Sequence, residues 1–323
     1  MSDLKLGLIG LDTSHVEAFA EVFNNPQCPH YIKGFRITHA FAGGSPDFPL
    51  SINRVGGFTR LLSENYGVSI VESPESVARS VDAILLTTAD GRLHPEQFRV
   101  IAPQRKPTFI NKPLAVSAVA AAEIARTASQ FGVRVFSSSN LRFSDVLIDA
   151  ISKRDLGEII GADVAGPLPL EDTQPGFFWY GIHLVEMLFC ALGPRCSSLQ
   201  VSTREGHELV VAEWECGRFG TIRGNRVGCS HFTVVLRRER GDQWVDLSRG
   251  AQPCVGLANV MAEFFRGGVA PVPLDETEAV VRFIEIANES RRTGNRMAVP
   301  AARSAGSVGP IGSDAMTGKC NES

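Results

Sequence analysis

Lys112, His183 and Tyr180 are the side chains whose types could carry proton transfer and charge stabilisation. Lys112 stands between Asn111 and Pro113 after an apolar run, and Tyr180 lies three residues before His183. An imidazole accepts a proton near neutral pH, and an ammonium stabilises negative charge that develops on oxygen. A histidine in an apolar helical stretch is more often a buried structural residue. These side chains therefore form a reactive group only if the fold brings them together.

The first turn, from Gly10 to His15, has the layout of a nucleotide-binding turn. A strand leads through it into a helix, whose free amides and dipole favour an anion. Dinucleotide-binding turns read G-x-G-x-x-G, but Asp12 and His15 stand here at the second and third glycine positions. Asp12 or Thr13 could instead cap the helix that follows Ser14. For Asp12 we expect capping, because a carboxylate beside a pyrophosphate would repel it.

The end of the second predicted strand lacks the acid that binds an adenosine ribose in many NAD-binding folds. Residues 41–45 read Phe-Ala-Gly-Gly-Ser, and Asp47 comes two residues late. Ser45 and Arg54 leave room for a 2′-phosphate, whereas a flexible Gly-Gly turn without a ligand fits equally well. The residues therefore leave NAD and NADP undistinguished.

Residues 109–113, Phe-Ile-Asn-Lys-Pro, resemble the Gfo/Idh/MocA family of NAD(P)-dependent oxidoreductases. In that family the corresponding segment usually reads Glu-Lys-Pro, after the strand that borders the nicotinamide, so Asn111 replaces the glutamate. The resemblance also covers His94 with the strand before it, residues 105–107, and the late segment 264–278. It spans nearly the whole chain except the tail.

A second-domain helix carries the family's catalytic histidine, commonly with an aspartate four residues before it and another three residues after it. His183 matches that position, Glu186 follows three residues later, and Trp179 replaces the earlier aspartate. The resemblance implies His183 as the base, Lys112 as the cation that stabilises charge on oxygen, and Tyr180 as a hydroxyl sharing proton transfer. Glu186 could orient the imidazole or form part of a polar helix face.

The resemblance also implies a cofactor site and a substrate site. The expected cofactor-binding residues are Gly10, Asp12, Thr13, Ser14, His15, Ser45, Thr87, Thr88, His94, Asn111, Lys112 and Pro113. The expected substrate-binding residues are Lys112, Arg142, Trp179, Tyr180 and His183. For Arg142 an ion pair that links the domains is the alternative. The peptide before Pro113 can be cis, since that isomer costs only about 0.5–1 kcal/mol at an X-Pro bond.

A doubly wound sheet would position these residues. Up to about residue 140, short apolar runs alternate with helical stretches, which predicts βαβ units and a mostly parallel sheet. The expected strands are residues 5–10, 36–42, 83–88, 108–110 and 133–137. Val16, Phe19, Ala20 and Phe23 recur at helical spacing, and a helix over 117–131 should end at Gly132.

The second half predicts helices and then a largely antiparallel sheet. Helices at 146–153 and 182–192 flank a loop at 166–176, strands are expected at 209–215, 219–223 and 232–237, and helices follow near 255–265 and 276–292. The predicted fold class is α/β, with a Rossmann-type doubly wound parallel sheet at 1–140 and a C-terminal α+β domain with an open sheet at 141–302. A disordered tail is expected at 303–323.

Composition narrows the class of protein. The 323 residues are 44% apolar and 21% charged, with a formal charge of −3, so nucleic acid is not an expected partner. We expect no signal peptide and no membrane span, and seven cysteines without a CxxC pair favour a reducing cytoplasm. No HxH or HExxH spacing indicates a metal, and residues 137–140 lack the glycines of a nucleophile elbow.

The resemblance implies a cytoplasmic NAD(P)-dependent oxidoreductase that interconverts a secondary alcohol and a ketone on a sugar, cyclitol or related polyhydroxy compound. One alternative is redox-neutral elimination or glycoside cleavage with tightly bound NAD on the same scaffold. Another is a non-catalytic protein that has lost the cofactor, which Asp12 favours. The resemblance further implies a homodimer or homotetramer, packed through the exposed face of the C-terminal sheet.

Overall fold

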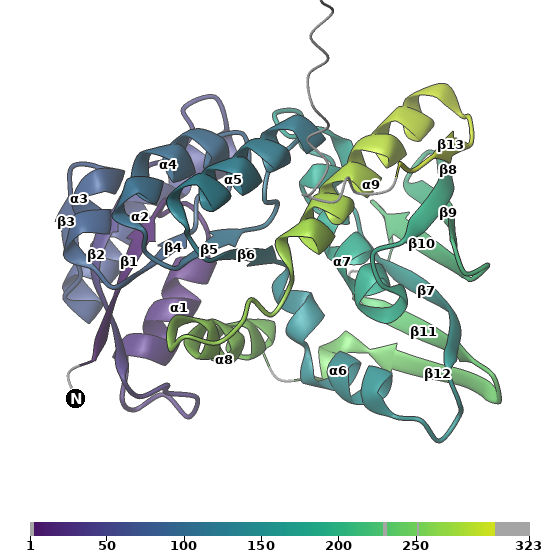
Figure 1. The fold of residues 1–323 in the computed structure, drawn as a ribbon, viewed down its shortest axis with the longest axis horizontal. Helices are drawn as coiled ribbons and strands as arrows, with labels where there is room; N and C mark the ends of the chain where they lie inside the picture. Colours follow the sequence, from purple (N-terminus) through teal and green to yellow (C-terminus); the bar gives the residue numbers. More distant parts are fainter. Residues whose placement is uncertain (1–2, 229–230, 251, 301–323) are drawn as a thin grey trace, which may run out of the picture.

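The protein contains two sheets, one in each half of the chain, with helices between and around them (Figure 1). This computed structural model describes residues 3–228, 231–250 and 252–300. The tail expected to be disordered, residues 303–323, lies outside the described residues.

The first sheet has six parallel strands in the order β3-β2-β1-β4-β5-β6. Its strands are β1 (Leu4–Ile9), β2 (Phe35–Phe41), β3 (Ser69–Val71), β4 (Ala83–Leu86), β5 (Thr108–Asn111) and β6 (Val135–Ser138). Its helices are α1 (His15–Asn24), α2 (Pro49–Tyr66), α3 (Pro74–Ser80), α4 (His94–Ile101) and α5 (Ala118–Phe131), with a 3-10 turn η1 (Ala102–Gln104). The strand order reverses between β1 and β4, and sheets of this type bind ligands at the carboxyl ends of the strands there.

The local sequence explains how these helices pack and end. The predicted stripe of α1, namely Val16, Phe19, Ala20 and Phe23, is buried. Gly132 ends α5 at a φ of 66°, and its N–H donates to carbonyl groups of the last turn. Glycine adopts this left-handed conformation without a steric penalty. The predicted stripe and cap are both confirmed.

The second sheet has seven strands in the order β12-β11-β7-β10-β9-β8-β13, and only β7 and β10 pair in parallel. Its strands are β7 (Ile159–Pro167), β8 (Cys196–Arg204), β9 (His207–Trp214), β10 (Phe219–Asn225), β11 (Thr233–Arg238), β12 (Gly241–Asp246) and β13 (Met297–Ala298). The helices of this half are α6 (Asp145–Ser152), α7 (Gly181–Leu192), α8 (Pro253–Phe265) and α9 (Leu274–Thr293), with 3-10 turns η2 (Asn140–Phe143), η3 (Gly176–Phe178) and η4 (Leu247–Arg249). The predicted fold class is confirmed.

The strands β3 and β7 are missing from the sequence-based prediction. β7 is rich in glycine and alanine, and the loop expected at 166–176 overlaps its last two residues. A Cβ atom on Gly166 would lie 2.4 Å from the Phe232 ring and 3.0 Å from Leu184. The small residues therefore permit close packing in a central strand, a tertiary demand that local strand propensity does not reveal.

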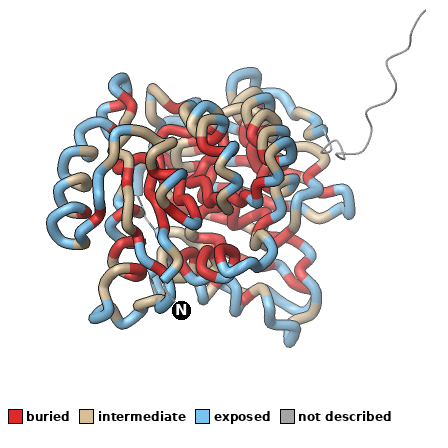
Figure 2. Tube along the Cα trace, turned by 60° about the vertical axis from the view of Figure 1, so that its left-hand side comes forward, coloured by how far each residue is buried: buried red, intermediate tan, exposed pale blue. Residues whose placement is uncertain are grey.

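The helix α8 joins the end of the chain to the first half. It follows the second sheet in sequence but packs against α1 (Figure 1). Leu257, Met261 and Phe264 of α8 belong to the same apolar core as Phe19 and Phe136. Buried segments accordingly run through the middle of the molecule (Figure 2).

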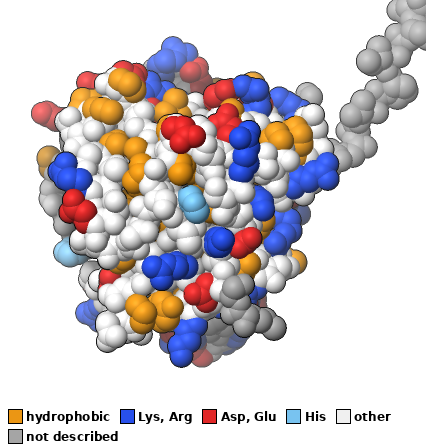
Figure 3. Space-filling model, turned by 90° about the vertical axis from the view of Figure 1, so that its left-hand side faces the viewer, with side chains coloured by type: hydrophobic (Ala, Val, Ile, Leu, Met, Phe, Trp, Pro, Cys, Tyr) orange, Lys and Arg blue, Asp and Glu red, His pale blue; other side chains and the backbone are white. Residues whose placement is uncertain are grey.

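The outer surface of the first half carries charges of both signs. On the face seen in Figure 3, basic and acidic side chains are interspersed with apolar and uncharged groups. Among the described residues, no helix combines the length and apolar character that a membrane crossing requires.

Candidate active site

A cavity of about 250 Å³ lies where the two halves meet. Its wall is formed by Thr13, Ser14, His15, Arg54, Ala89, Asn111, Lys112, Trp179, Tyr180 and His183. These residues come from the start of α1, from α2, from the segments after β4 and β5, and from the start of α7. The cavity therefore brings Lys112 and His183 together from positions 71 residues apart in the chain. We call it the basic cavity.

Lys112 follows β5 directly, and its peptide bond to Pro113 is cis. Its side chain is only 8% exposed, and Nζ donates a hydrogen bond to the Trp179 carbonyl oxygen at 3.2 Å. Nζ also lies 5.0 Å from the centre of the Trp179 ring and 5.9 Å from that of Tyr180, within the range of cation–π attraction. Burial lowers the pKa of the Lys112 ammonium to about 8.

His183 lies in the first turn of α7 and is held by a residue of the first half. Its Nδ1 atom is 2.6 Å from the Ser139 hydroxyl, which follows β6. Its Nε2 atom has no hydrogen-bond partner among the described residues and is the ring nitrogen left for the cavity. Burial, followed by the charges of Lys112 and His15, holds the pKa of His183 well below its usual value. The imidazole is neutral at pH 7 and can accept a proton.

Arg142 does not line the basic cavity. It is buried, and its Nη1 donates to Glu186 at 2.9 Å, while Nη2 pairs with Glu276 of α9. Glu186 also accepts hydrogen bonds from the Ser139 backbone N–H and the Ser138 hydroxyl, each at 3.3 Å. Arg142 therefore forms ion pairs within the second half, not the ion pair between domains that was the alternative, and its expected substrate contact stays a prediction. Glu186 supports the segment that bears Ser139, and no hydrogen bond joins it to the His183 ring among the described residues.

Asn111, which replaces the family's glutamate, connects β5 to α1. Its Oδ1 lies 3.2 Å from His15 Nδ1, and its Nδ2 donates to the Thr87 carbonyl oxygen at 3.4 Å. This amide orientation requires the proton of a neutral His15 to be on Nδ1, because Oδ1 can only accept. Burial, aided by the charge of Lys112, lowers the pKa of His15 to about 4. His15 thus presents a neutral ring to the cavity.

Asp12 does not cap α1, so that expectation is wrong. The helix has Ser14 at its N-cap position, without a side-chain cap bond. The Asp12 carboxylate is fully buried and accepts a hydrogen bond from the Ala89 backbone N–H at 2.9 Å and one from the Ser51 hydroxyl at 2.5 Å. Two buried donors need this acceptor, which explains why the side chain turns inward. Burial raises the pKa of Asp12, and it outweighs these two hydrogen bonds, which lower that pKa.

A second cavity, of about 310 Å³, lies beside the segments after β2 and β4. It is lined by Gly44, Ser45, Pro46, Asp47, Asp90, Arg92 and Leu93. The Asp12 contacts lie between the two cavities, because Ala89 lines the first, and Ser45 of the second donates its N–H to Ser51. Asp12 itself lines neither cavity.

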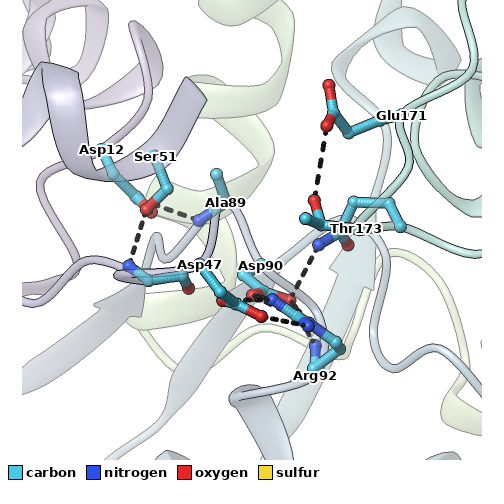
Figure 4. A network of polar contacts seen from close by, with 10 residues as sticks. Asp12, Asp47, Ser51, Ala89, Asp90, Arg92, Glu171 and Thr173 are labelled. Carbon is cyan, nitrogen blue, oxygen red and sulfur yellow. Dashed lines mark hydrogen bonds and ion pairs between the residues drawn. The ribbon is translucent and has the colours of Figure 1, made fainter. Parts of the chain in front are cut away.

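Ion pairs and hydrogen bonds join residues that line the second cavity (Figure 4). Arg92 contacts Asp47 at 2.8 Å and Asp90 at 2.6 Å, so it joins the segment after β2 to the segment after β4. Gln174 of the second half donates to Asp90 at 3.1 Å. The segments that surround the sheet crevice are therefore tied to one another and to the second half.

Comparison with solved structures supplies the decisive observation on the fold. GenD2 from gentamicin A biosynthesis, solved in complex with NAD, is 17% identical; the match covers 93% of this chain and 97% of that chain, with a TM-score of 0.75. Myo-inositol 2-dehydrogenase from Lactobacillus plantarum is 16% identical, with 93% and 100% coverage and a TM-score of 0.74. This chain has the fold of the Gfo/Idh/MocA-type dehydrogenases.

A further structure with this fold is the WlbA dehydrogenase from Bordetella pertussis, in complex with NADH and UDP-GlcNAcA. It is 16% identical, with 93% of this chain and 98% of that chain covered and a TM-score of 0.73. No family model matches the sequence, and the comparison with curated proteins gives no match. The Gfo/Idh/MocA-type fold is therefore recognised here through structure.

Besides Asp12, five of the expected cofactor-binding residues line neither cavity: Gly10, Thr87, Thr88, His94 and Pro113. The Thr87 hydroxyl donates to the Gly10 carbonyl oxygen at 2.7 Å. Gly10 has a φ of 90°, and a Cβ atom there would lie 2.5 Å from the Thr88 backbone. The ring nitrogens of His94 lie 2.9 Å from the carbonyl oxygens of Thr88 and Pro113. In the structure these residues fix the loops whose other residues form the cavity walls.

Ser139, Ser51 and Ala89 are site residues that the sequence analysis does not identify. Ser139 belongs to a Ser-Ser-Ser-Asn turn, which predicts a strand end and nothing about an imidazole 44 residues away. Ser51 and Ala89 are defined by their bonds to Asp12. The one signal in the sequence is Asp12 itself: an acid at a glycine position of the first turn indicates that hydrogen-bond donors lie near it in the fold.

Proposed function

We propose that this protein is an NAD(P)-dependent oxidoreductase that interconverts a secondary alcohol and a ketone on a polyhydroxy compound. The observation that carries the proposal is the convergence of Lys112 and His183 on one cavity beside the start of α1. The solved dehydrogenases of the same fold support it, since they include an inositol dehydrogenase and complexes with NAD or NADH. Five cysteines in the described part of the chain are free, which supports a reducing compartment such as the cytoplasm.

The residues present fit a dinucleotide at the crevice between β1 and β4. The Ser14 side chain does not cap α1, but the Thr13 hydroxyl accepts the His15 N–H at 3.4 Å and the Thr13 carbonyl oxygen accepts the Val16 N–H at 3.2 Å. A pyrophosphate there would therefore be stabilised by the helix dipole and by Arg54, which adds a positive charge at the same cavity. Ser45 and Gly44 line the second cavity, where an adenosine ribose would lie. Asp12, which favoured a non-catalytic protein, lines neither cavity and so does not repel a phosphate from within them.

The chain's own residues would then divide the chemistry among them. The bound nicotinamide accepts or returns the hydride. His183 accepts the hydroxyl proton at Nε2, while Ser139 at Nδ1 holds the ring in place. The Lys112 ammonium stabilises the negative charge that develops on the substrate oxygen. The Tyr180 ring lies 5.1 Å from the His183 ring, centre to centre, so its hydroxyl is available to share proton transfer.

Cofactor titration combined with two variants tests this function. NADH and NADPH binding is followed by nicotinamide fluorescence, and turnover is followed with myo-inositol and a panel of sugars and sugar acids. Lys112→Ala and His183→Ala should bind cofactor as the wild type does and lose turnover by about 10²-fold or more. Lys106→Ala is the matched control, since Lys106 precedes β5, at the opposite end of the strand from Lys112, and lines neither cavity. The proposal is refuted if neither NADH nor NADPH binds, or if turnover is unchanged in Lys112→Ala or in His183→Ala.

A redox-neutral reaction with a retained cofactor is the second candidate. It is favoured by the contacts that close the crevice, namely those of Asp12 with Ala89, Arg92 with Asp47, and Gln174 with Asp90. A cofactor enclosed by such contacts would exchange slowly. Mass spectrometry that finds NAD in the purified protein, together with substrate conversion and no release of NADH, supports this reading over net oxidation.

A further inference from the structure

The wall of the basic cavity is positively charged. Lys112 and Arg54 supply two cations, His15 and His183 supply two imidazoles, and no aspartate or glutamate lines the cavity among the described residues. The chain as a whole has a formal charge of −3, so this local excess of positive charge is not a feature of the overall composition. A ligand that fits the cavity therefore meets donors and cations on several sides.

The Lys112 ammonium is buried without a counter-ion in the described structure. It has three N–H donors, and the Trp179 carbonyl oxygen accepts one of them. The neighbouring ring faces of Trp179 and Tyr180 stabilise a cation only in part. A buried charge without an opposite charge is costly, so a ligand anion would complete this site.

The nearby buried carboxylates are already engaged elsewhere. Asp12 accepts from Ser51 and Ala89, and Glu186 is paired with Arg142. Neither of them lines the basic cavity. Among the described residues, neither of these carboxylates is left to balance Lys112, so we look to a ligand for the negative charge.

The same charge balance bears on His183. A proton accepted at Nε2 would place an imidazolium beside the Lys112 ammonium, and both already lose solvation through burial. A bound anion next to Lys112 offsets that repulsion and makes His183 a stronger base. An anionic substrate thus supports the proton transfer as well as the binding.

We propose that the basic cavity takes a polyhydroxy carboxylate, with the carboxylate as the counter-ion of the Lys112 ammonium and hydroxyl groups facing Tyr180, His15 and His183. The reacting hydroxyl in this assignment rests on the proposed function, whereas recognition of the anion does not. Arg54 and the start of α1 remain for a cofactor pyrophosphate, so the charge of Lys112 is left for the substrate. A phosphate ester offers the same charge, and the experiment separates it from a carboxylate.

Calorimetric titration of the whole protein tests the assignment with probes of matched size. D-Gluconate is compared with D-glucitol, which has the same carbon chain and no charge, and with glucose 6-phosphate, each with and without saturating NAD⁺. Gluconate should bind at least tenfold more tightly than glucitol and more tightly than the phosphate ester, in both conditions. Its affinity should fall as the pH rises above about 8, where Lys112 loses its proton.

Variants locate the effect. Lys112→Met keeps most of the length of the side chain and should abolish the preference for gluconate, and Lys112→Arg should retain much of it. Lys106→Met, at a lysine that lines neither cavity, should leave it unchanged. Equal affinity for glucitol, preference for the phosphate ester, displacement of gluconate by NAD⁺, or an unaffected Lys112→Met variant each overturns the inference. The pH series on the wild type decides the matter if a variant fails to fold.

The two proposals fail separately. If the protein prefers gluconate but does not bind NAD(P), the proposed oxidoreductase function is wrong and the proposed anion site stands. If the protein oxidises neutral polyols with NAD(P) and shows no preference for an anion, the proposed anion site is wrong and the proposed oxidoreductase function stands.

Discussion

At the scale of single residues, burial tunes the proton affinities that the proposed reaction needs. Lys112 and His183 are 8% and 7% exposed, and in both cases burial is the largest cause of a lowered pKa. Desolvation disfavours the charged form of both groups. The result is a histidine that is neutral at pH 7 beside a lysine whose pKa lies near 8.

The pH dependence of kcat/KM should reflect this pair. Turnover needs neutral His183 and charged Lys112, so kcat/KM should be flat from about pH 6.5 to 7.5 and fall about tenfold per pH unit above 8. Lys112→Arg should remove the alkaline fall, because a guanidinium stays protonated beyond pH 12. Initial rates across pH 6–10 measure this. An alkaline fall that persists in the arginine variant would assign it to another group.

At the scale of elements, the sequence predicts which strand or helix carries each reactive side chain. It does not predict which residues hydrogen-bond to that side chain and hold it in place. Lys112 follows a predicted strand and His183 lies in a predicted helix, and the family resemblance implies that both reach one site, as the cavity between the two halves shows. Ser139, by contrast, becomes part of the site through a contact across 44 residues. Such contacts depend on packing and not on local pattern.

Asp12 is a residue for which the local sequence predicts a contact that the structure does not contain. Its place in the first turn predicts a helix cap, because local propensity is all that the sequence offers there. The structure turns the carboxylate toward Ala89 and Ser51, 77 and 39 residues away. Long-range donors thus override a local preference, and the Asp12 carboxylate does not occupy the start of α1.

Removing the Asp12 carboxylate should destabilise the first half. Asp12→Ala leaves the buried Ala89 N–H and Ser51 hydroxyl without their acceptor, which should lower the free energy of unfolding by about 2–4 kcal/mol. Asp47→Ala is the control: Asp47 is 65% exposed, so loss of its pair with Arg92 should cost less than about 1 kcal/mol. Urea unfolding followed by circular dichroism compares the two. Equal losses would mean that Asp12 does not join the strand-end segments as inferred.

At the scale of the whole molecule, the two halves are built to stay together. α8 completes the core of the first half, and Gln174 and Trp179 reach from the second half to the segments around the crevice. The Trp179 ring also packs edge-on against the Phe48 ring, with centres 5.0 Å apart. The cavity that holds Lys112 and His183 is thus a product of the entire chain.

In the described part of the chain, the helices that contact the second sheet lie on one side of it (Figure 1), and we propose that a second copy of the chain covers the other face. On β9, Val210 and Ala212 are buried, whereas the alternate residues Leu209 and Val211 are 41% and 42% exposed. Phe219 of the neighbouring strand β10 is 56% exposed. Three exposed apolar side chains on adjacent strands are typical of an interface.

A single charge on this face should separate the subunits. In a two-fold dimer each substituted position occurs in both copies, so Val211→Glu buries two new carboxylates in one interface and should yield monomers. Val119→Glu is the matched control, because Val119 is 76% exposed on α5, away from this sheet. Size-exclusion chromatography with light scattering at about 50 µM measures the mass. A wild-type protein that is monomeric under these conditions, or a Val211→Glu variant that remains dimeric, would exclude this face as the interface.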